Sequence, residues 1–232
     1  MTKSFSFTGR DNYGTSNFTV FSEWENLFSP MYEVTDRSHP GSDFLGRLDA
    51  WGSSGALIAD ISSAYQVFDR NEYMAKFNPV EGLTVILPKK GKIDLKTCGR
   101  CFEIKEGDAV VIGGDGSYSL NFSEFEVFII VIPFSVLGSY PCVLRLEKIF
   151  YLDGKYPGNK ILIEFISGEC ERLKKLWRID YSVRVRVISK ALLDMLKEKY
   201  IPRIKGGRLL SNLWLIIFRI IYIHQSFHWR IL

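Results

Sequence analysis

The chain has 232 residues, of which 47% are hydrophobic, 14% aromatic and 24% charged. This composition can fill a hydrophobic core, and it excludes a disordered or collagen-like chain. Four Cys and three His leave little material for a disulfide scaffold or a histidine-rich metal site.

The net charge of +4 conceals an uneven distribution of charge along the chain. Residues 172–208 hold twelve Lys and Arg against three acidic residues, whereas residues 1–171 are acidic overall. Such a basic segment is typical of a solvated helix surface, or alternatively of a segment beside a nucleic-acid-binding region.

The start of the chain has no apolar stretch of the secretory type, so the sequence predicts a cytoplasmic protein. One apolar run covers residues 213–223. As a helix it would reach only about 16 Å, roughly half a bilayer core, and it contains Arg219. We therefore expect no membrane insertion.

The first two-thirds of the chain predicts strands. Residues 1–17 are polar and predict a flexible arm, and a short lead-in element follows over 18–27 with Trp24 and Leu27 as an apolar pair. Short strands separated by Gly-rich turns are typical of an all-β sandwich or barrel. We expect strands at 44–50, 56–61, 65–70, 83–87, 92–95, 100–104, 109–112, 117–122 and 125–133. The last of these contains an apolar run, 127–132, that indicates a strand covered on both faces.

The pattern changes to helical periodicity after residue 150. A helix is predicted from residue 158 to 177, because its apolar residues recur at spacings of three and four. They are Leu162, Ile166, Cys170, Leu173 and Trp177. A second helix is predicted over 183–199, and Pro202 ends it. Two helices with a short connection suggest an antiparallel hairpin.

The motifs that carry catalytic chemistry are weak. Cys98 and Cys101 form a C-x-x-C pair, but it lies between two predicted strands, so a hairpin turn at residues 99–100 is the favoured interpretation over a redox pair or half a zinc site. There is no G-x-S-x-G, and His39 is the one histidine before residue 224. The Gly-rich stretch 113–116 lacks the Lys-Ser/Thr of a phosphate-binding loop.

Five segments resemble the amino-terminal domain of AraC/XylS-type transcription regulators. They are FSEWENL (21–27), FLGRL (44–48), GALIADI (55–61) leading to Arg70, GRCFEIKEGD (99–108) followed by 128–133, and ALLDML (191–196). The resemblance covers roughly residues 15–200. It implies an α+β fold, with a cupin-like antiparallel β-barrel (a double-stranded β-helix) followed by a C-terminal helical pair.

The resemblance also implies different functions for two parts of the chain. The barrel, residues 18–150, would sense a small-molecule effector, and the helical segment 151–201 would form a homodimer. Effector-pocket candidates are Trp51, Tyr65, Phe68 and Arg70, where the aromatic rings enclose a ligand and Arg70 pairs with its carboxylate. The alternative places the aromatic residues in the core and Arg70 at the surface. Dimer-helix candidates are Leu162, Ile166, Leu173 and Trp177.

The stretch 99–110 also looks like the second cupin box. Enzymatic cupins carry Pro where Lys105 stands and a metal-binding His where Val110 stands, and the chain has no H-x-H for the first box. Because valine cannot ligate a metal, we expect no metal, no cofactor and no enzyme activity. A cupin-type small-molecule enzyme is the alternative.

The C-terminal segment departs from the family pattern. The resemblance implies two DNA-binding helix-turn-helix units after the helical pair, but residues 202–232 form an apolar tail with one cation in 213–223. We expect the DNA-binding module to be missing or degenerate, through truncation or out-of-frame translation, so that DNA binding is weak or absent. Alternatively the tail is native and docks on a partner or a membrane surface.

Overall fold

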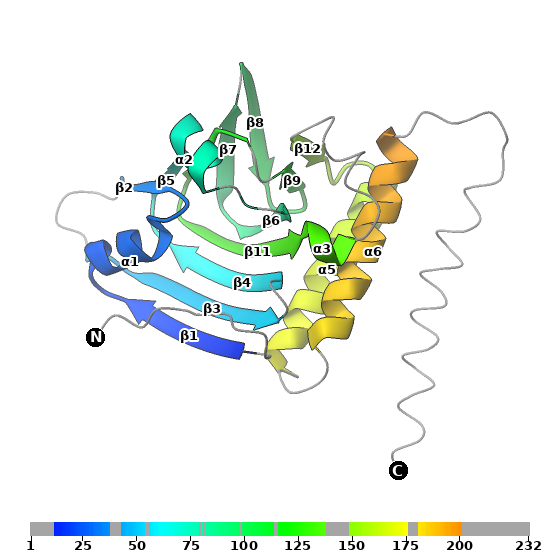
Figure 1. Cartoon of the computed structure of the whole chain (residues 1–232), viewed down its shortest axis with the longest axis horizontal. Coiled ribbons are helices and arrows are strands. Elements are labelled where there is room, and N and C mark those ends of the chain that lie inside the picture. The colour runs from blue at the N-terminus through cyan, green and yellow to red at the C-terminus, as the bar shows by residue number, and fades with distance from the viewer. Residues whose placement is uncertain are drawn as a thin grey trace, which may run out of the picture. The chain divides into compact units, whose positions relative to one another are not determined.

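Figure 1 shows the computed structural model of the chain. The structure describes residues 12–37, 43–53, 56–78, 80, 82–97, 99–113, 116–137, 149–175 and 181–200. Residues 1–192 form one compact unit, and the second unit, 193–232, contributes only residues 193–200 to the described part. The following description concerns the first unit.

A seven-stranded antiparallel sheet forms one layer (Figure 1). Its order is β1-β3-β4-β11-β6-β9-β12, and every neighbouring pair is antiparallel. The strands are β1 (Asn12–Phe18), β3 (Gly46–Ser53), β4 (Ala56–Ser63), β11 (Phe125–Pro133), β6 (Gly82–Lys90), β9 (Ala109–Gly113) and β12 (Ile149–Leu152).

A five-stranded antiparallel sheet forms the second layer, in the order β2-β5-β10-β7-β8. Its strands are β2 (Glu33–Asp36), β5 (Gln66–Arg70), β10 (Tyr118–Phe122), β7 (Lys92–Thr97) and β8 (Arg100–Lys105). Alternate residues of both sheets form one core cluster, which includes Ile86, Val110, Leu95 and Leu120. This arrangement confirms the predicted antiparallel β-sandwich, since one face of each sheet is buried against the other.

The strand β11 illustrates why some strands are apolar throughout. Val127 belongs to the core between the sheets, whereas its neighbour Phe128 leaves the opposite face and is also buried. Helices lie against that opposite face, so both faces of the strand exclude water. The prediction of a strand covered on both faces is confirmed.

Two long helices accompany the seven-stranded sheet, α5 (Pro157–Lys175) and α6 (Tyr181–Tyr200). Both were expected from their periodicity, within a few residues of the observed ends. The buried Arg184 of α6 binds Glu169 of α5, and Tyr181 of α6 bonds to the backbone of β3, so both helices contact their neighbours directly. The predicted helical pair is therefore present.

A shorter helix, α1 (Phe21–Phe28), covers one end of the sandwich (Figure 1). Its Trp24 is fully buried and packs on Phe18, Phe28 and Phe44. A Cβ at Gly46 would collide with the Trp24 ring, so any other residue there would force the buried ring to shift. The predicted lead-in element is thus a helix that closes one end of the core, and we call α1 the plug helix.

Four short elements have no counterpart in the sequence prediction. They are β2, β12, α2 (Glu72–Phe77) and α3 (Phe134–Leu137). Each has six or fewer residues, too few to show a period of either kind. Segments of this length are held by their neighbours rather than by their own pattern.

The predicted flexible arm over residues 1–17 needs correction in its second half. Asn12–Phe18 form β1, paired along its whole length with β3, whereas residues 1–11 lie outside the described part. The strand is polar because its side chains alternate between exposed and half-buried at the sheet edge. An edge strand held by backbone hydrogen bonds needs no hydrophobic alternation, and its sequence therefore resembles a loop.

The turns also refine the sequence picture. In the β7–β8 pair Thr97 lies opposite Arg100, so Arg100 belongs to β8 and not to the turn predicted at 99–100. Gly99 and Gly107 adopt φ of +77° and +87°, in the left-handed region that favours glycine. Pro88 lies inside β6 rather than in a turn, beside a register shift in the pairing with β11, which is where a strand tolerates proline.

Candidate functional site

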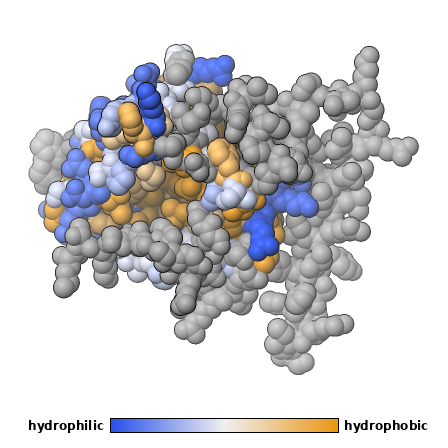
Figure 2. Space-filling model, in the orientation of Figure 1, coloured by the Kyte–Doolittle hydropathy of each residue, from blue (hydrophilic) through white to orange (hydrophobic). Residues whose placement is uncertain are grey.

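The interior between the sheets contains two of the four effector-pocket candidates, Phe68 and Arg70. Both lie on β5 two residues apart, so their side chains leave the same face of the strand. Phe68 is buried and meets Phe28, Tyr32 and Phe122 edge to face, with ring centroids 5.3–5.8 Å apart. Figure 2 shows hydrophobic residues gathered in the middle of the face in view, with hydrophilic residues around them.

Arg70 is 1% exposed, which contradicts the alternative that placed it at the surface. Its Nη1 donates to the carbonyl of Met31 at 3.0 Å, and its Nη2 donates to the carbonyl of Asn78 at 2.6 Å. The guanidinium therefore joins the segment before β2 to the segment after α2. Pairing of Arg70 with an effector carboxylate stays a prediction.

Beside Arg70 lie two tyrosines that the sequence analysis did not select. Tyr118 faces Arg70 across the β5–β10 ladder, and its hydroxyl lies 2.8 Å from that of Tyr32. Burial raises the pKa of both hydroxyls, although their mutual hydrogen bond lowers that of Tyr32. Both groups thus stay protonated at neutral pH, and each can donate or accept a hydrogen bond.

A second polar chain joins the plug helix to the strands. The indole of Trp24 donates to Gln66 at 2.8 Å, Gln66 donates to Ser63 at 2.7 Å, and Ser63 donates to the carbonyl of Leu45 at 3.0 Å. Each donor in this chain has an acceptor inside the protein. The chain therefore fixes α1 in place.

The other two effector candidates lie elsewhere. Tyr65 is 50% exposed in the turn between β4 and β5. Trp51 is buried, but it lies on β3 next to Ala50, a member of the core between the sheets, and so its side chain leaves the opposite face of the seven-stranded sheet. The structure groups Phe68 with Arg70 and separates both from Trp51 and Tyr65.

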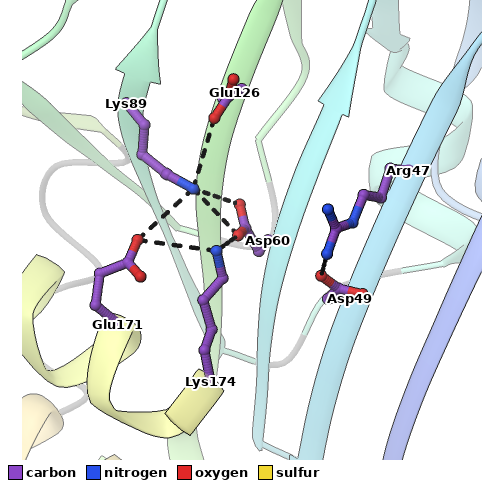
Figure 3. Close-up of polar contacts among 7 residues, drawn as sticks. All are labelled: Arg47, Asp49, Asp60, Lys89, Glu126, Glu171 and Lys174. Carbon is purple, nitrogen blue, oxygen red and sulfur yellow. Dashed lines mark hydrogen bonds and ion pairs between the residues drawn. The ribbon is translucent and has the colours of Figure 1, made fainter.

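The opposite face of the seven-stranded sheet carries a network of charges (Figure 3). Asp60 of β4 is buried, and both its oxygens accept from Lys89 of β6 at 3.0 and 3.1 Å. Lys174 of α5 binds the same carboxylate. Glu171 of α5 lies 3.7 Å from Lys89 and 3.8 Å from Lys174. The network thus joins two strands of the sheet to the helix.

Aromatic and electrostatic effects support this network. The ring of Phe128 lies under the ammonium groups of Lys89 and Lys174, at 4.6 and 5.5 Å from its centroid. Burial lowers the pKa of Lys174, but its hydrogen bond to Asp60 and the charge of Asp60 outweigh burial and leave the pKa raised. Lys174 is therefore a cation at physiological pH.

A second charged contact joins the two helices. Arg184 of α6 donates to Glu169 of α5 at 2.6 Å, and both side chains are less than one-tenth exposed. Arg172, which is largely exposed, binds the other oxygen of Glu169. The sequence offers one signal for such sites, an ionisable residue inside an apolar run, as Asp60 is in β4.

The dimer-helix candidates lie inside the single chain. Leu162, Ile166 and Leu173 are at most 7% exposed, and Trp177 lies outside the described residues. A contact between two copies through α5 would have to use its exposed residues, such as Ile161. The apolar stripe that suggested a dimer is explained by burial within one chain.

The residues of the second cupin box form β8, a turn and β9. Val110, at the position of the metal-binding histidine, is fully buried in the core between the sheets. Asp108 follows the turn and accepts from the hydroxyl of Tyr151 and the backbone of Gly154, both at 2.9 Å. These partners give Asp108 a structural role, because they join the turn to the segment before α5.

Neither cysteine chemistry nor a metal cluster is evident in the described part of the chain. Cys101 is exposed, its partner Cys98 lies outside the described residues, and burial raises the pKa of the Cys170 thiol. Among the described residues, no group of three or more His, Cys, Asp or Glu is placed to hold a metal ion. None of the described helices is both long and apolar enough to cross a bilayer.

Comparison with solved structures finds proteins of similar fold. The AraC-like transcriptional activator CuxR superposes with a TM-score of 0.66 at 16% identity, over 95% of this chain and 81% of CuxR. ToxT from Vibrio cholerae gives 0.49 at 11% identity, over 68% of this chain and 61% of ToxT. A cupin superfamily protein from Desulfitobacterium hafniense gives 0.33 at 13% identity, over 42% of this chain and 84% of that protein.

The likeness to CuxR defines a class of fold. The chain shares with CuxR an arrangement of two antiparallel sheets packed as a β-sandwich and followed by a helical pair. No protein family model and no curated protein sequence matches the chain. At identities this low, the likeness establishes the fold.

Proposed function

We propose that this chain is the regulatory part of an AraC-type transcription regulator, which senses a small-molecule effector and forms a homodimer. The observation that carries the proposal is the likeness to CuxR over 95% of the chain, from the sandwich into the helical pair. CuxR is an AraC-like transcriptional activator, and the same combination of elements supports a regulatory rather than a catalytic role here.

The interior of the sandwich supports effector sensing. Aromatic surface comes from Phe68, Tyr32 and Tyr118, and the two tyrosines also carry protonated hydroxyls. Arg70 adds a buried cation. Small-molecule sites combine apolar walls with a few converging polar groups of this kind. In this proposal an effector displaces the hydrogen bond between the two tyrosines and binds their hydroxyls.

The charge network on the other face supports transmission of the effector signal. Asp60 on β4 and Lys89 on β6 flank β11, and both interact with charged residues of α5. A shift of these strands on effector binding would move the partners of Lys174 and Glu171. The helical pair would respond as a unit, because Glu169 and Arg184 join its members.

The experiment is to measure oligomeric state and bound metal on the same purified full chain. Light scattering should give the mass of a dimer, and elemental analysis should find iron, manganese and zinc well below one per chain. A monomer at all concentrations would contradict dimerisation, and one bound metal per chain would favour the cupin-enzyme alternative.

Effector sensing is tested separately by thermal unfolding with the low-molecular-weight fraction of a cell extract. A ligand that binds the folded state raises the melting temperature of the protein. We expect an increase that is lost in Tyr118→Phe and kept in the control Tyr156→Phe, since Tyr156 is 64% exposed. Equal shifts in both variants would contradict an effector site at Tyr118.

A further inference from the structure

Asp49 and Trp51 lie two residues apart on β3, and both side chains leave the sheet face on which α5 and α6 contact the strands. They are 4% and 3% exposed. Their neighbours Leu48 and Ala50 belong to the core between the sheets, on the opposite face. The pair is therefore distinct from the interior that contains Phe68 and Tyr118.

Each of the two side chains buries a polar atom without a hydrogen-bond partner in the described part of the chain. The atoms are Oδ1 of Asp49, an acceptor, and Nε1 of Trp51, a donor. A buried polar group without a partner is unfavourable, so such groups are uncommon in folded proteins. Here one acceptor and one donor without partners among the described residues lie on the same strand face. A ligand that both donates and accepts a hydrogen bond could bind the two atoms together.

The surrounding charges favour a donor that is a cation. Asp49 stands directly opposite Asp60 on β4, and both Lys89 and Lys174 bind Asp60 (Figure 3). The cation that binds Asp49 is Arg47, which reaches Oδ2 at 2.6 Å and is 61% exposed. Asp60 thus has two ammonium partners, whereas the buried carboxylate of Asp49 has one exposed guanidinium on Oδ2 and, in the part of the chain that the structure describes, no partner on Oδ1, so a cationic donor at Oδ1 is stabilised.

An aromatic pair lies beside these two residues. Tyr13 of the edge strand β1 is paired in register with Trp51, and their rings stack with centroids 5.4 Å apart and planes at 30°. Tyr13 is 48% exposed, whereas Trp51 is covered. A ring that is exposed on one side offers its face to an ammonium group.

From these contacts we propose that Asp49 and Trp51 form a binding site for a small primary amine that carries a hydroxyl group on a neighbouring carbon. The ammonium donates to Oδ1 of Asp49, beside the Tyr13 ring, and the hydroxyl oxygen accepts from Nε1 of Trp51. The site lies at the start of α6, because the hydroxyl of Tyr181 donates to the carbonyl of Trp51 at 2.7 Å. The strand that binds the occupant is thus bonded directly to the first turn of that helix.

The test uses serinol, the amine analogue of glycerol, as the probe. The indole N–H signals of the full chain are followed in a proton–nitrogen correlation spectrum, and Trp51→Phe identifies the signal of Trp51 among five tryptophans. Serinol should move this signal saturably. Glycerol at the same concentration, with sodium chloride to match ionic strength, should not.

Two variants separate a binding role from a structural one. Asp49→Asn should weaken serinol binding about tenfold or more, which corresponds to loss of one charge-assisted hydrogen bond. Arg47→Met should strengthen it, because the positive charge of Arg47 on Oδ2 repels the ammonium on Oδ1 and partly neutralises the carboxylate that binds it. Asp69→Asn, on the other sheet, serves as the control for removal of a carboxylate and should leave binding unchanged.

The proposal is overturned if serinol leaves the Trp51 signal in place, if glycerol moves it equally, or if Arg47→Met weakens binding. An experimental structure with serinol present in which an ordered water bridges Asp49 and Trp51 would also overturn it. None of these outcomes bears on the effector site between the sheets, so the proposed function stands or falls on its own experiments.

Discussion

The ammonium group of Lys174 on α5 binds the carboxylate of Asp60 on β4, and this contact fixes the helix to the seven-stranded sheet. Asp60 also accepts two hydrogen bonds from Lys89, so one buried carboxylate serves two cations from different elements. The helix is therefore attached to the sheet through an ion-pair network in which Lys174 and Lys89 share the carboxylate of Asp60.

Loss of either partner should therefore destabilise the fold. Lys174→Met should lower the free energy of unfolding by about 2 kcal/mol, less than for a fully buried pair because Lys174 retains some exposure. Asp60→Asn should cost more, since two ammonium groups lose their anion. Urea unfolding followed by far-UV circular dichroism measures both. Lys90→Met, which removes an exposed pair with Glu124, is the matched control and should leave the midpoint unchanged.

The contact between α5 and α6 makes a second prediction. Arg184→Met should lower the free energy of unfolding by about 3 kcal/mol, because it leaves the carboxylate of Glu169 buried with one exposed partner. In a double-mutant cycle with Glu169→Gln, the coupling energy should exceed about 1 kcal/mol. Arg172→Met removes the exposed partner of the same carboxylate and should cost less than Arg184→Met. Additive effects of Arg184→Met and Glu169→Gln would show that the ion pair adds nothing.

The alkaline side of the pH–stability profile tests the buried hydroxyl pair. Tyr32 and Tyr118 have pKa values raised by burial, and Lys174 has a pKa raised by Asp60. All three groups bind their protons more tightly in the folded state. Their contribution is therefore complete below the unfolded pKa values, about 10 for Tyr and 10.4 for Lys, and is lost as pH rises through the folded values.

We expect the unfolding free energy to fall steeply above about pH 10. Tyr118→Phe should make the fall less steep, because it removes one of these groups, and Tyr156→Phe is the control for loss of an exposed hydroxyl. Urea unfolding at a series of alkaline pH values measures the slope. An unchanged slope in Tyr118→Phe would argue against a buried hydroxyl at this position.

Alanine substitution should change the free energy of unfolding by different amounts at three glycines, Gly107, Gly154 and Gly158. A methyl group at Gly154 would collide with the backbone carbonyl of Gly107, so Gly154→Ala should cost at least about 2 kcal/mol. Gly107→Ala meets no neighbouring atom but is strained at φ of +87°, which costs about 1 kcal/mol. Gly158→Ala, inside the helix and open to solvent, should stabilise by a few tenths of a kcal/mol, or about 1 at most. Thermal unfolding of the three variants gives the order, and an equal cost at 107 and 154 would contradict the close approach of these two segments.

Much of the fold follows from local pattern. The strands of the sandwich and both long helices alternate or repeat apolar residues with the correct period, so their positions were predictable to within a few residues. The polar edge strand β1 was not, because its pairing with β3 depends on backbone groups that every residue carries. The short strands β2 and β12 are likewise set by their partners.

The candidate site was predictable in part. Phe68 and Arg70 are two residues apart in a predicted strand, and side chains two residues apart leave the same face of a strand. Their separation from Trp51 could not be foreseen, because the sequence does not state which face of each strand points to the helices and which to the other sheet. Tyr32, outside every predicted strand, reaches Tyr118 only through the tertiary fold. The same holds for Asp60 and Lys174, which come from distant parts of the chain.

In the proposed function this chain is a regulatory domain that dimerises and responds to a ligand. A fusion of the full chain to a monomeric DNA-binding domain that represses a palindromic operator only as a dimer measures both properties in one assay. We expect repression of a reporter gene, a change in repression when the low-molecular-weight fraction of a cell extract is supplied, and loss of that change in Tyr118→Phe. Repression no greater than that of the isolated DNA-binding domain, from a fusion protein that is folded and expressed, would contradict the proposed function.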